Sequence, residues 1–351
     1  MRFVRYRHVD PAARTAVPGL DGPVRARLGL QFGAGADGRG GSILPLSMLP
    51  VVGEDEDRAR ALDDADLAAY LAADPLLAAA RAGLGRLPDP SALLLPAGSV
   101  RLLAPVHRPG KIVGVGHNYR EHVEEQSIPI PDRPLLFAKW ANAVVGDGEP
   151  VIRPNVTHAL DLEAELAVVV GARARRVPET LALAHVAGWT AVNDVTARDL
   201  QGQKSALGLG ERGDGQWARA KSSDTFLPMG PALVTPDEFP DIATVAIRSW
   251  RATAGSAPLQ MQDGSPRTMI FSVPQLIAFI SQVITLEPGD VILTGTPSGV
   301  GVFRDPPVFL VPGDVASIEV SGIGRLDNPV VASDETFPQG SPAAAILGTP
   351  R

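Results

Sequence analysis

The first hundred residues show two kinds of hydrophobic pattern. The opening RFVRY alternates as a strand does, and a second strand-like run covers residues 25–32 before the glycine-rich turn GAGADGRGG. Residues 56–86 instead repeat Ala and Leu at helical spacing, and prolines then interrupt the chain. Residues 1–105 therefore predict a small α+β domain of their own.

Beyond that point the pattern changes to many short apolar runs separated by Gly and Pro. They include KIVGVG, PLLFAKW, LEAELAVVVG, VAGWTAVNDV, GPALVT, DVILTGT and DVASIEVSGIG. Only 273–285 predicts a strong helix, because its apolar positions form one stripe and Ser272 with Gln275 fits a capping box. Many strands with few helices predict a β-rich α+β fold, with 106–335 as a barrel, roll or sandwich. Residues 336–351, rich in Pro, Ala and Gly, predict a loose tail.

Composition narrows the classes of protein that the chain can represent. Its 351 residues carry a formal net charge of −7, which argues against a nucleic-acid binder with a basic face. No apolar run approaches the ~20 residues that span a bilayer, so we expect no membrane partner and a cytoplasmic location. Cysteine is absent, which excludes disulfides, thiolate nucleophiles and cysteine zinc sites. Any metal must therefore bind oxygen or histidine ligands.

The segment LDLEAEL, residues 160–166, places three acids at alternate positions. Side chains alternate between faces along a strand, so Asp161, Glu163 and Glu165 would share one face. The segment continues as an apolar run that should enter a core, where neighbouring carboxylates need a compensating cation. Hard oxygen ligands without thiolates favour Mg²⁺ or Mn²⁺, with Ca²⁺ as a further candidate. The alternative is a solvated strand face with unpaired acids.

Two later segments could complete such a site. In WTAVNDVTARDLQ, residues 189–201, Asp194 ends a strand-like run and could supply a third carboxylate. Arg198 could hold a ligand carboxylate, or it could form a structural ion pair with Asp199. In LTGTPSGVG, residues 293–301, glycines and hydroxyls suit a turn that cradles a carboxylate or an enolate, and a plain β-turn is the alternative. The turn is not a phosphate-binding loop, because the Gly-Lys-Ser/Thr ending of such loops is missing.

The segment GVGHNYREHVEEQ, residues 114–126, follows a short apolar run. By itself it fits a capped, solvated helix start. If a metal site lies beside it, His122 becomes the candidate base, because an imidazole has an unperturbed pKa of ~6.5. Glu125 follows three residues later on the same helix face and can orient that imidazole. The segment predicts a strand exit followed by a short lid helix, with His117 as a positioning residue or a substrate contact.

Seven segments, in their order and approximate spacing, resemble the fumarylacetoacetate hydrolase superfamily. They are KIVGVGHNYREHVEE, PLLFAKW, LDLEAELAVVVG, GWTAVNDVTARDLQ, WARAKSSDTFLPMGP, TGTPSGVG and GDVASIEVSGIGRLDNPV. The resemblance covers residues 105–331, and the first hundred residues resemble the variable N-terminal domain of many members. It implies a mixed β-roll, in a homodimer, that binds a small 2-oxo or dicarbonyl acid.

The resemblance also implies roles for individual residues. The implied metal ligands are Glu163, Glu165 and Asp194. The implied catalytic group is His122, Glu125 and Lys221. The implied substrate contacts are Tyr119, Lys139, Arg198, Gln201, Thr296 and His117. Val115 stands where some members carry a fourth carboxylate, so the chain resembles the three-carboxylate branch.

These roles predict a metal-dependent hydrolase that cleaves a carbon–carbon bond of an acylpyruvate through a metal-stabilised enolate. His122 and Glu125 would activate the attacking water, and Lys221 would stabilise the developing negative charge. The same site could instead serve a decarboxylase, hydratase or isomerase of related 2-oxo acids. A catalytically silent binding member is a third alternative, which the presence of the whole residue set disfavours.

Overall fold

The computed structural model describes residues 1–9, 26–50, 55–74, 77–203, 215–239 and 241–333. The predicted C-terminal tail, 336–351, lies outside these residues. Within them, no single helix is long and apolar enough to cross a membrane, whereas α2 (Leu67–Ala73) and α3 (Ala78–Arg86), a bent pair, pass that test together on length and composition alone.

Strands dominate the described part of the chain and form two larger sheets and a two-stranded ladder. The first sheet contains β1 (Arg2–His8), β2 (Arg27–Phe32), β3 (Ser42–Pro45), β4 (Leu95–Pro96), β5 (Val100–Leu103), β6 (Ile112–Gly116), β7 (Leu135–Lys139), β8 (Val144–Val145), β11 (Ala164–Val170), β12 (Val186–Asn193), β14 (Leu227–Val234) and β17 (Val291–Leu293). The second sheet contains β9 (Val151–Arg153), β15 (Ile247–Thr253), β16 (Leu259–Gly264), β18 (Asp314–Val320) and β19 (Gly324–Ala332). The ladder pairs β10 (Leu160–Asp161) with β13 (Thr196–Ala197).

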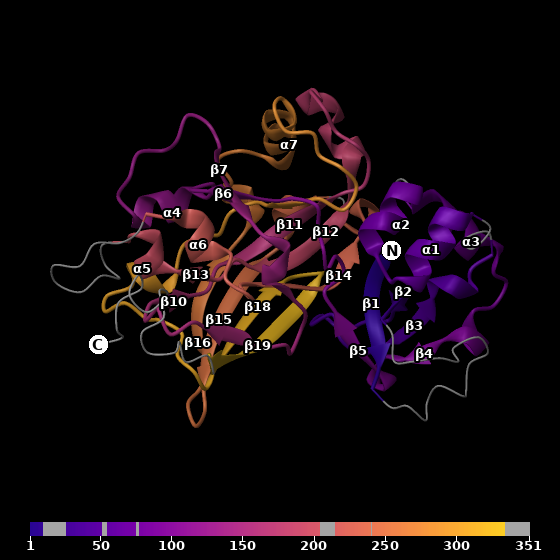
Figure 1. Ribbon diagram of the computed structural model, residues 1–351, viewed down its shortest axis with the longest axis horizontal. Helices are drawn as coiled ribbons and strands as arrows, with labels where there is room; N and C mark the ends of the chain where they lie inside the picture. The colour runs from indigo at the N-terminus through magenta and orange to yellow at the C-terminus, as the bar shows by residue number, and fades with distance from the viewer. Residues whose placement is uncertain (10–25, 51–54, 75–76, 204–214, 240, 334–351) are drawn as a thin grey trace, which may run out of the picture.

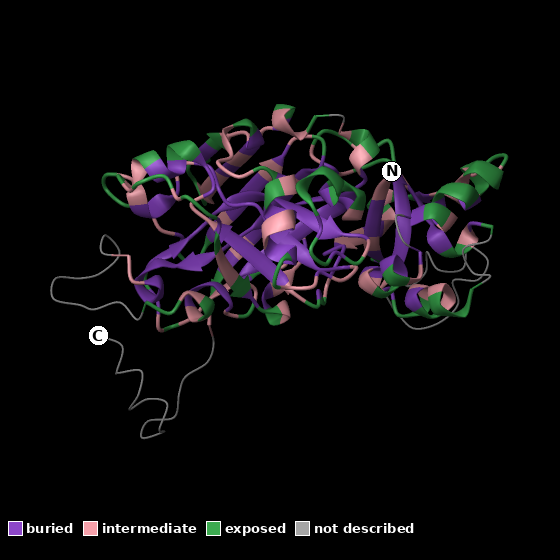
Figure 2. Ribbon diagram, turned by 90° about the horizontal axis from the view of Figure 1, so that it is seen from above, coloured by how far each residue is buried: buried purple, intermediate pink, exposed green. Residues whose placement is uncertain are grey.

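Parallel and antiparallel pairings coexist in both larger sheets. β11 pairs antiparallel with β12 and β17, while β17 pairs parallel with β6. The apolar run of β11 is buried on both faces: Val168 packs in one hydrophobic cluster with Ile318 of β18, and Val169 packs in another. Figure 2 shows the strands buried along most of their length beneath helices with exposed outer faces. The predicted β-rich mixed roll is confirmed.

Helices are few and mostly short, as the pattern predicted. Residues 56–86 contain α1 (Glu56–Asp63), α2 and α3, and the described residues beyond 105 contain α4 (Arg120–Glu125), α5 (Arg198–Gln201), α6 (Trp217–Lys221) and α7 (Val273–Ser281). The capping box of α7 is confirmed, with the Ser272 N–H donating to Gln275 Oε1 at 2.8 Å. The helix ends at Ser281, before the predicted 285. The helices α4, α5 and α6 are too short to show an apolar stripe, so hydrophobic periodicity alone could not locate them.

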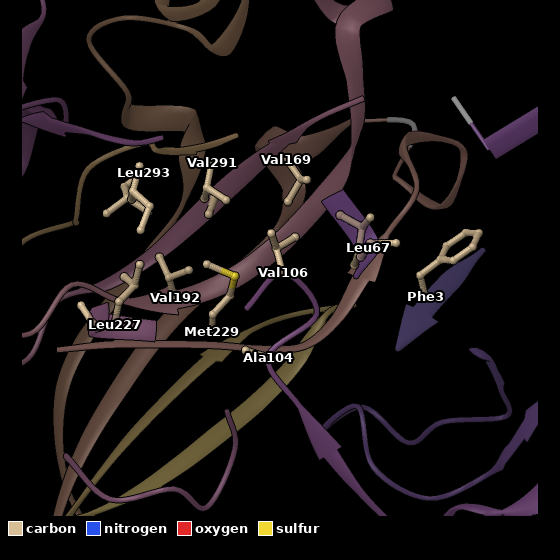
Figure 3. Close-up of a cluster of buried hydrophobic side chains, with 14 of the residues drawn as sticks. Phe3, Leu67, Ala104, Val106, Val169, Val192, Leu227, Met229, Val291 and Leu293 are labelled. Atoms are coloured by element: carbon tan, nitrogen blue, oxygen red, sulfur yellow. The ribbon is translucent and has the colours of Figure 1, made fainter. Parts of the chain in front are cut away.

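The N-terminal elements gather at one end of the molecule (Figure 1), and their strands belong to the first sheet. β1 pairs antiparallel with β14, so that Phe3 lies opposite Leu233. Figure 3 shows Phe3 and Leu67 near one end of a hydrophobic cluster that continues past Val169 to Leu293. The sheet and this cluster therefore cross the predicted domain boundary at residue 105, and the boundary itself stays a prediction.

Candidate active site

A polar pocket lies at the opposite end from the N-terminal helices, where Figure 1 places α4, α5 and α6 together. It is lined by Val115, Gly116, His117, His122, Gln126, Phe137, Glu163, Glu165, Asp194, Arg198, Gln201, Gln203, Trp217, Lys221, Thr296 and Phe303. The enclosed space amounts to only about 20 Å³, roughly the room that one water molecule needs. In this conformation the free space inside the pocket is therefore small.

Three buried carboxylates converge at the floor of this pocket. Glu163 and Glu165 flank Ala164 at the start of β11, and Asp194 follows the last residue of the neighbouring β12. The pairing of β11 with β12 continues one step further, because the Asp194 N–H donates to the Glu163 carbonyl at 2.9 Å. One carboxylate oxygen from each residue lies within 4.8 Å of the others. The structure thus brings together the three predicted metal ligands.

Two buried cations hold Glu163. Arg198 Nη2 donates to Glu163 Oε1 at 2.5 Å, and Lys221 Nζ donates to Glu163 Oε2 at 2.7 Å. Burial alone would raise the pKa of Glu163, but the charges of these two partners outweigh burial and hold it far below its ordinary range. Glu163 therefore stays ionised.

Asp194 also lies between two cations. Lys139 Nζ donates to Asp194 Oδ1 at 2.6 Å, and Lys221 Nζ donates to Asp194 Oδ2 at 2.5 Å. Lys221 has its third hydrogen bond to Thr196 Oγ1 at 2.8 Å, so all three of its donors are engaged. Burial opposes the charge of Lys221, yet Asp194 and Glu163 raise its pKa. For Lys139 burial dominates and lowers the pKa.

Glu165 differs from the other two carboxylates because no cation in the described part of the chain forms an ion pair with it. Its Oε2 accepts the Gly295 N–H at 2.8 Å. Burial and the charges of Asp194 and Glu163 raise its pKa well above the ordinary value. A divalent cation bound by the three carboxylates would supply the missing charge, and the oxygen-only ligand set suits Mg²⁺ or Mn²⁺. The residues present therefore fit such a metal.

The prediction that Asp161, Glu163 and Glu165 lie on one continuous strand is wrong, and Asp161 is not part of the three-carboxylate cluster. The strand breaks after Asp161, between β10 and β11. The Asp161 carboxylate instead accepts the N–H groups of Gly301 at 2.8 Å and Val302 at 3.0 Å. These backbone donors, together with Arg198, hold Asp161 outside the carboxylate cluster. The alternation rule fails here because the segment is not one continuous strand.

The alternative in which Arg198 forms an ion pair with Asp199 is not found among the described contacts. Arg198 Nε donates to Asp161 Oδ2 at 2.9 Å, and Arg198 Nη1 donates to Gln201 Oε1 at 3.1 Å. Asp199 accepts instead from Thr157 Oγ1 at 2.6 Å. Arg198 thus faces the pocket, with its charge balanced by Asp161 and Glu163. Its pKa is raised because the two carboxylates outweigh burial.

The glycine-rich turn after β17 serves two carboxylates through its backbone. Gly295 donates its N–H to Glu165 as described above, and Gly299 donates its N–H to Glu125 Oε2 at 2.9 Å. Both glycines have positive φ, 93° and 100°, a conformation that side-chain-bearing residues rarely adopt. Thr296, between them, donates its hydroxyl to the Ala164 carbonyl at 2.9 Å. The turn therefore donates to two protein carboxylates, and its predicted binding of a substrate carboxylate or enolate stays a prediction.

The segment that carries the two histidines has the predicted local structure. β6 ends at Gly116, His117 adopts a positive φ of 55°, and α4 begins at Arg120. His122 Nδ1 lies 2.6 Å from Glu125 Oε1 within α4. Because Glu125 also accepts from the glycine-rich turn, the helix is fastened over the pocket. The orientation of His122 thus depends on two separate parts of the chain.

His117 lies beside His122, with ring centroids 6.3 Å apart, and packs edge-on against Trp217. Burial and the charge of His122 lower its pKa, which favours the neutral imidazole. A positive φ at a bulky residue is uncommon and often marks a functional site. This placement is compatible with the predicted substrate contact.

Two residues predicted to contact substrate do not line the pocket. Tyr119 is fully buried in a hydrophobic cluster, and Lys139 lies beneath Asp194 with its ammonium enclosed. Lys139 therefore acts on the site through Asp194. The predicted contacts His117, Arg198, Gln201 and Thr296 do line the pocket.

Aromatic lining residues were not anticipated from sequence. Phe137, Trp217 and Phe303 form much of the wall, and Lys221 Nζ lies 4.8 Å from the centroid of the Phe137 ring. Phe137 pairs with Gly114, where any Cβ would lie 2.1 Å from the ring. Gly114 leaves room for the Phe137 ring, but the sequence does not show this because the two residues become neighbours only through the pairing of β6 with β7.

Replacing Lys139 with methionine should cost about 3 kcal/mol of unfolding free energy, because it leaves one side of the buried Asp194 carboxylate without its cation. Urea denaturation measures this loss. Lys111→Met is the matched control. Its side chain is partly exposed beside Asp290, so it should cost about 1 kcal/mol or less. Equal losses in the two variants would contradict the importance of the Lys139–Asp194 pair.

Comparisons with known proteins point to one family. The family model "Fumarylacetoacetate (FAA) hydrolase C-terminal" matches residues 111–331. The bovine (Bos taurus) protein "Oxaloacetate tautomerase FAHD2A, mitochondrial" is 45% identical over 238 residues, which are 68% of this chain and 72% of the relative.

Two solved structures, each 31% identical to this chain, share its fold. One is fumarylacetoacetate hydrolase from Exiguobacterium antarcticum, with a TM-score of 0.68 over 94% of this chain and 100% of that chain. The other is 5-carboxymethyl-2-hydroxymuconate delta-isomerase from Mycobacterium smegmatis, with a TM-score of 0.64 over 95% and 100%. Together with the buried carboxylates and the ordered motifs, these matches show that the chain belongs to the fumarylacetoacetate hydrolase family.

Proposed function

We propose that this protein is an isomerase that interconverts the keto and enol forms of a small 2-oxo dicarboxylic acid such as oxaloacetate. The observation that carries the proposal is the His122–Glu125 pair, with Nδ1 and Oε1 2.6 Å apart, in the pocket that holds the carboxylate cluster. A proton-transfer group beside a cation-binding site is what tautomerisation needs. The relative named as an oxaloacetate tautomerase supports this choice over the hydrolase that the sequence predicted.

The chain's own residues supply the proton transfer. The Nδ1 atom of His122 is occupied by Glu125, which leaves Nε2 as the nitrogen that can take a proton from C3 of the substrate. The negative charge of Glu125 stabilises the imidazolium that results. Delivery of that proton to the ketone oxygen completes the conversion from keto to enol. One proton moves, and no carbon–carbon bond breaks.

Two positive charges could bind an anionic substrate in this pocket: a divalent cation and the guanidinium of Arg198. Glu163, Glu165 and Asp194 would hold the divalent cation, which when bound polarises the ketone oxygen of a 2-oxo acid. Arg198 lines the pocket and can face a substrate carboxylate. Phe137 and Trp217 form the apolar wall and keep water away from these charges.

A second candidate is the carbon–carbon hydrolysis of an acylpyruvate. The same His122–Glu125 pair favours it, because a base that removes a C3 proton can also activate a water. The similarity to a solved fumarylacetoacetate hydrolase also supports this candidate. The two functions differ in whether a carbon–carbon bond breaks.

Purified protein supplied with Mn²⁺ should accelerate the loss of enol absorbance when enol oxaloacetate is diluted into buffer, and EDTA should abolish the acceleration. A parallel assay follows cleavage of an acylpyruvate by product analysis. We expect tautomerisation to exceed cleavage by at least about 100-fold in kcat/KM, a difference of about 2.7 kcal/mol in activation free energy. Cleavage without tautomerisation would establish the hydrolase instead.

A further inference from the structure

Gln262 of β16 is a buried amide that reaches the candidate active site from the second sheet. Its Oε1 accepts the Ala164 N–H at 2.9 Å and the Ser249 hydroxyl at 2.8 Å. Its Nε2 donates to Thr296 Oγ1 at 2.7 Å and to the Pro297 carbonyl at 2.8 Å. Both donors and the acceptor oxygen are therefore satisfied.

These partners lie at two places that matter for the site. Ala164 stands between the metal-ligand candidates Glu163 and Glu165, so the bond to its N–H fixes the backbone from which both carboxylates project. Thr296 and Pro297 lie within the glycine-rich turn, between the two glycines that donate to Glu165 and Glu125. One side chain thus connects the carboxylate strand with the turn.

The connection extends to the helix that covers the pocket. Gly299 packs so closely on β16 that any Cβ there would lie 2.2 Å from the Met261 carbonyl. Its N–H donates to Glu125, which in turn contacts His122. A displacement of the turn would therefore move the donor of Glu165 and the donor of Glu125 together.

We propose that Gln262 is a positioning residue that sets the carboxylates of Glu165 and Glu125 at once, by holding the glycine-rich turn against the start of β11. Gln262 is not among the residues that line the pocket. The proposed effect on Glu165, and so on cation binding, depends on the carboxylate cluster alone. The proposed effect on Glu125, and so on His122, rests on the proposed tautomerase function.

The test compares four variants with the wild type. Gln262→Met removes all four hydrogen bonds, and Gln262→Glu keeps the oxygen that accepts from Ala164 but loses both donors to the turn. Ser249→Ala removes only the hydroxyl bond. Gln260→Met is the matched control, because Gln260 lies on the same strand with an exposed side chain.

The first readout is the affinity of each EDTA-treated variant for Mn²⁺, measured by titration calorimetry without substrate. Both Gln262 variants should bind Mn²⁺ at least about 10-fold more weakly, as for other residues that orient metal ligands. Ser249→Ala and Gln260→Met should stay within about twofold of wild type. On oxaloacetate, the Gln262 variants should lose kcat while KM changes little. Thermal unfolding identifies folded variants, and Gln262→Glu carries the test if Gln262→Met does not fold.

Wild-type Mn²⁺ affinity in a folded Gln262 variant would overturn the positioning role. An equal weakening of Mn²⁺ binding in Ser249→Ala would also overturn it. That variant keeps both hydrogen bonds from Gln262 to the turn, so those bonds would not explain the weaker binding. Failure of the wild type on oxaloacetate would reject the proposed function but leave the Mn²⁺ comparison intact. The two proposals can therefore fail separately.

Discussion

Replacing Glu165 with glutamine is expected to raise the melting temperature of the EDTA-treated protein and to abolish its stabilisation by Mn²⁺. Glu165 is buried and lacks an ion-pair partner among the described residues, so its ionisation opposes folding until a cation compensates the charge. Wild-type protein should gain about 2.7 kcal/mol at roughly 100 times the dissociation constant of Mn²⁺. The variant should gain nothing and should lose about 1000-fold in activity. Scanning fluorimetry and the enol assay measure these changes.

The effect of Glu165→Gln should depend on pH in a defined direction. The pKa of Glu165 is raised well above its ordinary 4.5 by burial and by Asp194 and Glu163. The folded protein keeps this proton where the unfolded chain loses it, so the stabilising contribution is complete below pH 4.5 and declines as pH rises through the folded pKa. The advantage of the variant should therefore grow from pH 4.5 upward.

Glu287→Gln is the matched control for that experiment, because Glu287 is about half exposed and pairs with Arg173 at the surface. It should leave both the melting temperature and the Mn²⁺ response close to wild type. A Glu165→Gln protein that still shows the full Mn²⁺ response would remove Glu165 from the ligand set.

Replacing His122 with asparagine should lower kcat by about 100- to 10,000-fold, the range for removal of a general acid–base group. In His122, Nδ1 contacts Glu125 and leaves Nε2 to exchange a proton with the substrate. Asparagine has no group that corresponds to Nε2. The affinity for Mn²⁺ should not change, because the cation-binding carboxylates lie on other elements. Stopped-flow enol decay and Mn²⁺ titration measure the two quantities.

His185→Asn provides the same substitution away from the pocket, at the end of a surface 3-10 helix, and should retain full activity. Near-wild-type turnover in His122→Asn would mean that proton transfer does not depend on His122. The neighbouring imidazole of His117, with its ring centroid 6.3 Å away, would then become the candidate base.

Local features of the chain were predictable where their cause is local. The capping box at Ser272 and Gln275 depends on residues three apart, and so does the pairing of His122 with Glu125. The apolar run of β11 indicates a buried strand because burial on both faces requires an unbroken hydrophobic sequence.

Contacts between distant segments could not be derived in the same way. Asp161 was placed with Glu163 and Glu165 by alternation, but two backbone N–H groups some 140 residues further along the chain hold it elsewhere. Tyr119 carries a phenol that suits a substrate contact, yet packing places it in the core. Gln262 shows no sequence pattern at all, because its partners come from three separate elements.

The sequence by itself determined the chemical inventory: carboxylates without thiolates, a histidine and glutamate on one helical turn, and ordered motifs that identify the family. Tertiary structure decided which carboxylates meet and which cations balance them. Glu163 and Asp194 share Lys221, while Glu165 has no cation paired with it among the described residues and its pKa is raised. The physical reason is that residue type sets what a side chain can donate or accept. Strand register and burial set which partners lie within hydrogen-bonding distance and how strongly their charges interact.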